Sequence, residues 1–131
     1  MPFKAHIMGS GTSAGAAGAI LGGINSASVG AGTTKADATL LPLTSTHWIK
    51  TAANNSGVIL PPGNGTGDGM GANDSMIVYN ADANTLLLYP PAGGTLNAGT
   101  ASTGTVSIPT HTSVTVTSLN GLDFIVSGPT T

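Results

Sequence analysis

The stretch from Ser75 to Leu96 constrains the fold of this chain more than any other segment. It holds two apolar runs, at 75–80 and 85–89, which are joined by a short polar segment at 81–84. Runs rich in branched and aromatic residues and bounded by turn residues are typical of β-strands, and two of them with a short connection predict a β-hairpin. Neither run alternates strictly between polar and apolar residues. We therefore expect the hairpin to lie centrally, with both faces of each strand covered. One face would pack inside the domain, and the other would meet a second sheet, the N-terminal segment or a neighbouring subunit.

The scarcity of charged residues supports a β-rich chain. The 131 residues include no Arg, Glu, Gln or Cys, and charged residues make up 6% of the sequence, against about a quarter in a typical globular domain. The residues that favour exposed helices are therefore almost absent. A net charge of −2 without a basic cluster argues against nucleic-acid binding. So few surface charges also favour association with other protein subunits.

Strand signals recur from Ala36 to Ser127. The last two runs, Ser113–Ser118 and Asp123–Ser127, are separated by an Asn-Gly pair that is typical of a tight hairpin turn. In the first of these runs, valines alternate with Ser and Thr, as expected for a strand with one face in water. We predict an all-β fold with a β-sandwich or jelly-roll-like domain over residues 36–131. The runs expected as strands are 38–43, 47–52, 57–60, 75–80, 85–89, 103–108, 113–118 and 123–127.

Residues 1–35 differ from the rest of the chain. They are dominated by Gly, Ala and Ser, and their apolar side chains are scattered. Gly-rich segments lose much backbone entropy on ordering and offer little side-chain area in return. We predict an extended N-terminal arm that contacts partner subunits, and its apolar stretch is too short to span a membrane. The candidate anchors on this arm are Phe3, Ile7, Ile20, Leu21 and Ile24.

The sequence offers few residues for chemistry. Gly11–Gly15 matches the G-x-S-x-G pattern, but it lies in a low-complexity run without the strand and helix that a nucleophile elbow needs. The Gly-rich loop around Asp68 partly matches a calcium-binding nonapeptide, but it occurs once and is better explained as a loop with glycine turns. The histidines show no metal-ligand spacing. We predict no enzymatic activity, no cofactor and no bound metal.

The pattern GVILPP at 57–62, a glycine-rich loop, and DSMIVYNADANTLLLYPPAGGTLN at 74–97 resembles small structural proteins of tailed bacteriophages. The resemblance covers residues 36–128. It implies a virion protein similar to head decoration (cement) proteins, which are commonly homotrimers and bind the major capsid protein on the capsid surface. It carries no catalytic residues to transfer to this chain.

Two functions follow as hypotheses. The first is a capsid decoration protein that bridges capsid subunits and stabilises the phage head. The alternative is a receptor- or carbohydrate-binding module of a tail fibre or spike, with Trp48, Tyr79 and the loop 63–73 as its contact surface. A lone Trp in a small β-domain is more often a core or subunit contact than a sugar platform. Trp48, Tyr79 and Tyr89 therefore join the arm residues as expected interface residues.

Overall fold

The computed structural model describes residues 24–51, 53–61 and 70–128. Within these residues the chain forms eleven β-strands and one short 3-10 helix. The helix, η1, spans Lys35–Asp37. The strands are β1 (Ile24–Asn25), β2 (Val29–Gly30), β3 (Thr39–Leu40), β4 (Thr46–Thr51), β5 (Ser56–Ile59), β6 (Ser75–Asn80), β7 (Leu86–Tyr89), β8 (Thr95–Leu96), β9 (Val106–Ile108), β10 (Ser113–Ser118) and β11 (Asp123–Ser127).

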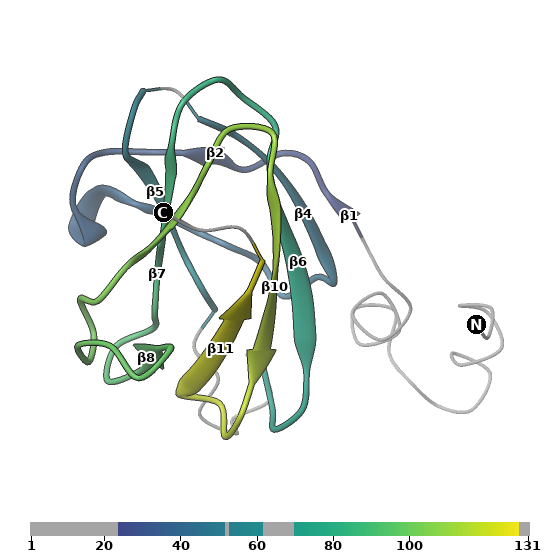
Figure 1. Ribbon diagram of the computed structural model, residues 1–131, viewed down its shortest axis with the longest axis vertical. Coiled ribbons are helices and arrows are strands. Elements are labelled where there is room, and N and C mark those ends of the chain that lie inside the picture. Colours follow the sequence, from purple (N-terminus) through teal and green to yellow (C-terminus); the bar gives the residue numbers. More distant parts are fainter. Residues whose placement is uncertain (1–23, 52, 62–69, 129–131) are drawn as a thin grey trace, which may run out of the picture.

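The described strands form two sheets, which make a β-sandwich-like domain (Figure 1). The larger sheet has the order β1-β4-β6-β10-β11-β8, and β2 also pairs with β4. The smaller sheet has the order β3-β5-β7-β9. In Figure 1, β6, β10 and β11 lie side by side in one layer, whereas β5 and β7 lie in the other. The all-β prediction is confirmed.

The predicted hairpin within Ser75–Leu96 is wrong. β6 pairs with β4 and β10 in the larger sheet, whereas β7 pairs with β5 and β9 in the smaller one. Residues 81–85 therefore form an arch between the two layers, not a turn within one sheet. The chain also changes sheets between β4 and β5 and between β5 and β6. As a result β6 runs parallel to β4, and β7 runs parallel to β5.

Asn80 fixes the arch at the end of β6. Its side chain is fully buried, and its Nδ2 group lies 2.7 Å from the carbonyl oxygen of Asn84 and 3.0 Å from that of Ile108. Its Oδ1 accepts a hydrogen bond from the backbone N–H of Asp82 at 3.2 Å. Burying an amide is favourable only when its hydrogen bonds are satisfied. Asn80 therefore holds the departing chain against β9, a contact that two neighbouring apolar runs cannot reveal.

The core lies between the two sheets, and strand alternation decides which side chains enter it. On β6, Met76 and Val78 are buried, whereas Ile77 is 43% exposed and Tyr79 is half-buried. Within the described residues, one face of this strand is covered by the core and the other carries exposed side chains. The buried apolar cluster consists of Leu41, Ile49, Val58, Leu60, Met70, Met76, Val78, Leu86, Leu88, Leu96, Ile108, Val114, Val116, Phe124 and Val126.

The larger sheet includes residues that the sequence assigned to the N-terminal arm. β1 and β2 both run parallel to β4, and Ala31 forms a bridge to Gly57 of β5. Residues 24–31 therefore contribute to the domain, whereas residues 1–23 lie outside the described residues. The described β-structure therefore begins at Ile24, before the predicted boundary at residue 36.

The C-terminal hairpin agrees with its prediction. β10 and β11 have the predicted bounds and pair antiparallel across the Asn-Gly turn, where Gly121 has a φ of 90°. A positive φ of this size favours glycine. Val114 and Val116 face the core while Thr115 is exposed, as their alternation predicts. Local sequence therefore determines this part of the fold.

Candidate interaction surface

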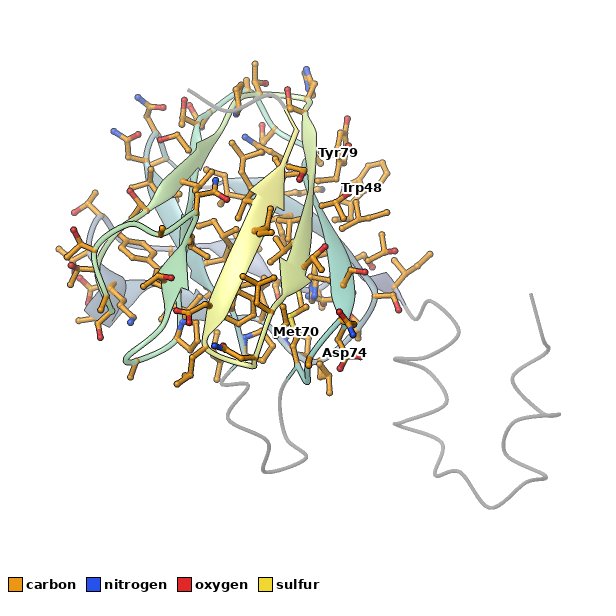
Figure 2. The ribbon with its side chains drawn as sticks, turned by 60° about the horizontal axis from the view of Figure 1, so that its bottom comes forward. Trp48, Met70, Asp74 and Tyr79 are labelled. Atoms are coloured by element: carbon orange, nitrogen blue, oxygen red, sulfur yellow. The ribbon has the colours of Figure 1, made fainter. Side chains whose placement is uncertain are left out.

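Trp48 and Tyr79 lie together on the side of the larger sheet that faces away from the core (Figure 2). The parallel pairing of β4 with β6 places the two residues opposite each other. Their ring centroids are 5.2 Å apart, and the ring planes meet at 67°, which is an edge-to-face arrangement. Such pairs contribute about 0.5–1.5 kcal/mol beyond simple burial. Trp48 is nevertheless 50% exposed, so Tyr79 orients an indole that is available for contact.

Further exposed apolar side chains lie on this side of the sheet, with threonines of β10 between them. Ile77 on β6 pairs with Thr115 on β10, and Thr117 on β10 pairs with Ile125 on β11. Ile125 is 45% exposed, and Ile24 on the edge strand β1 is 71% exposed. We call this surface the outer face and define it by Ile24, Thr46, Trp48, Lys50, Ser75, Ile77, Tyr79, Ser113, Thr115, Thr117, Asp123, Ile125 and Ser127.

The outer face carries little charge. Lys50 and Asp123 are its only charged side chains among the residues that the structure describes. Asp123 accepts hydrogen bonds from Asn120 Nδ2 at 2.9 Å and from Thr95 Oγ1 at 2.9 Å. These donors, first Asn120 and then Thr95, hold the pKa of the Asp123 carboxyl below its usual value. The carboxylate is therefore fixed in place and ionised at neutral pH.

A shallow hollow lies at the β11 end of the outer face. Its volume is about 540 Å³, and its lining combines apolar side chains with the carboxylate of Asp123. Leu119, which is 52% exposed, and Ile125 form part of its apolar wall. The residues around it are Thr95, Asn97, Ala98, Leu119, Asp123, Phe124 and Ile125.

A second hollow, of about 350 Å³, lies at the start of β6. Met70 and Asp74 are among its lining residues, and Figure 2 shows both at the end of the domain away from Trp48 and Tyr79. Asp74 Oδ2 accepts a hydrogen bond from the backbone N–H of Gly71 at 2.8 Å. This carboxylate closes a turn, so its position has a structural explanation.

A buried polar cluster joins β1 to β4 behind the outer face. Asn25 Oδ1 accepts from the backbone N–H of Ala27, which leaves Asn25 Nδ2 to donate to His47 Nδ1 at 3.1 Å. The proton of the neutral imidazole therefore sits on Nε2, which lies 3.3 Å from Thr44 Oγ1. His47 is fully buried, and this burial lowers its pKa from 6.5 to about 4 although Thr44 opposes the shift. The hydrogen bond between Asn25 Nδ2 and His47 Nδ1 requires that Nδ1 carry no proton.

The structure brings only some of the predicted interface residues together. Trp48, Tyr79 and Ile24 are all on the outer face. Tyr89 is 6% exposed and lies on β7 of the smaller sheet, where its ring packs closely over Gly57. Tyr89 is therefore buried within the described chain and is not an exposed contact residue. The remaining predicted anchors, Phe3, Ile7, Ile20 and Leu21, lie outside the described residues.

The described residues offer no constellation for metal binding. Across the described ranges, no three His, Cys, Asp or Glu side chains gather where they could hold a metal ion. Asp68, in the loop that partly matches a calcium-binding nonapeptide, lies outside those ranges. Within the same ranges, no helix has the length and apolar character needed to cross a membrane.

Ile77, Thr115 and Ile125 belong to the surface but were not predicted as interface residues. The available signal was strand periodicity, because a strand that buries Met76 and Val78 must turn Ile77 outward. The unbroken apolar run concealed that signal. The alternating valines of β10 indicate the exposed position of Thr115 directly.

Comparisons of the chain with protein-family models, with curated proteins and with solved structures gave no match. Function is therefore inferred from the outer face and its surroundings. Its distinguishing property is a continuous, weakly charged surface with a half-exposed indole, which is typical of protein contacts.

Proposed function

We propose that this protein is a structural virion protein, a decoration or cement protein that binds the outside of a phage head. The outer face carries this proposal, because Trp48, Ile77 and Ile125 expose apolar surface on a sheet with almost no charge. Exposed apolar side chains gathered on one side of a sheet mark a surface that another protein can cover. The two-sheet architecture supports the proposal. The proposal also includes a jelly-roll connection pattern and the resemblance to phage structural proteins.

The mechanism is mechanical. A protein that contacts several capsid subunits at once binds the assembled shell more tightly than any isolated subunit, because its later contacts are intramolecular. A ligand that binds only the assembled state also stabilises that state by mass action. The partners in this proposal are the major capsid protein and further copies of this chain. The homotrimer implied by the resemblance is a prediction that a mass measurement in solution tests.

The alternative is a receptor- or carbohydrate-binding module of a tail fibre or spike. The exposed Trp48–Tyr79 pair favours it, because aromatic rings can stack on sugars. The 67° angle between the ring planes weighs against a flat two-ring platform.

Copy number on purified virions tests the proposal. A decoration protein is present in many copies, in a fixed ratio to the major capsid protein, whereas a fibre module is present in few. Stripping the protein from heads should lower the temperature at which the shells break, and adding it back should restore that temperature. A few copies per virion, or heads whose stability is unaffected by removal, would exclude the decoration role.

A further inference from the structure

One row of side chains crosses the middle of the outer face. Thr46 on β4 pairs with Ile77 on β6. Ile77 in turn pairs with Thr115 on β10, and Thr115 pairs with Ser127 on β11. Ile77 and Thr115 occupy the middle of this row, and we call them the central pair.

The two charges of the outer face lie at opposite corners around the central pair. β4 and β11 point in the same direction, because β6 is parallel to β4 while β10 is antiparallel to both β6 and β11. Lys50 follows the row by four residues on β4, and Asp123 precedes it by four residues on β11. The two charges are thus four residues from the row, one toward the end of β4 and the other toward the start of β11. They also lie on the two outer strands of the four that the row crosses. The line between them passes over the central pair.

We propose that the outer face binds the same face of a second copy of this chain, about a two-fold axis that passes over the central pair. Rotation about an axis that lies in the interface, perpendicular to the line between the charges, exchanges the two corners. Lys50 of each copy then meets Asp123 of the other. Two-fold contacts require a self-complementary surface of this kind. The inference goes beyond the proposed function, because it holds wherever the protein acts.

The same rotation gives Trp48 a place to bind. Trp48 lies two residues above the central row on β4, and Ile125 lies two residues below it on β11. The rotation therefore carries Trp48 of one copy to the end of the second copy that holds the hollow beside Ile125. That hollow, of about 540 Å³ with Leu119 in its wall, has room for an indole ring. Aromatic side chains buried in a partner's hollow contribute most of the energy of many interfaces.

The extent of the outer face suits a stable contact. The larger sheet follows a six-strand path, and six strands spaced about 4.8 Å apart are about 24 Å across. Its longest strands have six residues, which corresponds to about 20 Å. A flat rectangle of this extent is at most about 480 Å². The side chains that stand on it raise the accessible area toward the ~800 Å² that each partner buries in a standard interface. The charge pairs lie at the rim, where they set orientation more than affinity.

Solution mass and Trp48 fluorescence of the full chain test the inference. Sedimentation over a wide concentration range should show association into species with an even number of chains, either dimers or pairs of the trimers that the resemblance implies. Because Trp48 is the only tryptophan, its emission should move to shorter wavelength as association proceeds. A chain that stays monomeric, or that stops at three copies, overturns the inference.

Matched lysine substitutions locate the contact. Ile77→Lys places two like charges beside the axis, and we expect association to weaken by about 100-fold, because like charges that meet in an interface cost several kcal/mol. Leu40→Lys is the control, since Leu40 is also an exposed aliphatic residue, at 59%, but lies on β3 of the smaller sheet. Equal association of Ile77→Lys and the native chain overturns the inference.

A charge exchange tests the orientation. Lys50→Asp removes both symmetry-related charge pairs and should weaken association by up to about 30-fold, since rim charge pairs contribute up to about 1 kcal/mol each, and the double variant Lys50→Asp/Asp123→Lys should restore it. Circular dichroism checks that the exchange leaves the Asn120 turn folded. Failure of a folded double variant to restore association excludes the proposed axis.

The outcomes separate this inference from the proposed function. Normal association in solution without attachment to phage heads rejects the decoration role and keeps the two-fold contact. If Ile77→Lys abolishes attachment to heads while its solution mass matches that of the native chain, the outer face binds the shell. That result overturns the inference and keeps the decoration role.

Discussion

Acidification from pH 7 to pH 4 should destabilise this domain through His47. The imidazole is neutral in the folded protein, because its Nδ1 accepts a hydrogen bond from Asn25 and its environment is desolvated. Protonation of Nδ1 would set two N–H groups against each other and bury a charge. The unfolded chain takes up this proton near pH 6.5, whereas the folded chain resists until about pH 4. The free energy of unfolding should therefore fall as the pH drops through this window and then level off.

The size of the effect follows from the pKa shift. A pKa lowered from 6.5 to about 4 corresponds to about 3 kcal/mol at about 1.4 kcal/mol per unit. Thr44 at the Nε2 side is only half-buried, so solvent screens part of the penalty. We expect a loss of about 2 kcal/mol between pH 7 and pH 4. Asp123, with its lowered pKa, should contribute to destabilisation only at still lower pH.

Chemical denaturation followed by far-UV circular dichroism measures this loss. The protein concentration stays fixed, so that self-association does not contribute. His47→Gln should be less stable at pH 7 but should lose most of the pH dependence, because glutamine does not titrate. His111→Asn is the control: His111 is exposed with a φ of 52°, a conformation that asparagine tolerates. If His47→Gln keeps the same pH dependence as the native chain, the neutral-imidazole argument is incorrect.

Two substitutions test the packing of β5 and of the arch that follows β6. Gly57→Ala would place a Cβ atom 2.5 Å from Cε2 of the buried Tyr89 ring, so we expect a loss of about 1–3 kcal/mol, measured as a lower denaturation midpoint. Asn80→Ala removes the donors to the carbonyls of Asn84 and Ile108. We expect the free energy of unfolding to fall by about 3 kcal/mol in the same assay. A neutral result in either case contradicts the role given to that residue.

The strands with clear local signals were predictable from sequence. β10 and β11 combine alternating residues with an Asn-Gly turn, and neither signal requires knowledge of the rest of the chain. β1 and β2 were not predicted, because each has only two residues and lies in a segment rich in Gly, Ala and Ser. Their place in the sheet depends on pairing with β4 and on the Asn25–His47 hydrogen bond, which joins residues far apart in sequence.

The connection between β6 and β7 shows why local patterns fail for this architecture. A short polar segment between two apolar runs fits a hairpin and an arch equally well. Asn80 favours the arch, because its side-chain amide donates to the carbonyls of Ile108, the last residue of β9, and of Pro109, which follows it. Trp48 and Tyr79 were each predicted as contact residues. Their position side by side follows only from the parallel pairing of β4 with β6, which the arches create.

The apolar residues of the outer face are not explained by the folding of a single chain. The core contacts of β6 come from Met76 and Val78, so Ile77 could be polar at little cost to the core. β10 places Thr115 at the neighbouring position, which confirms that the sheet tolerates a polar residue there. Single exposed apolar residues are common on proteins, but several of them on the same side of one sheet as a half-exposed Trp48 mark a contact surface. A chain with so few charges has little else to limit association, and the position of Lys50 and Asp123 at opposite corners then favours one orientation among many.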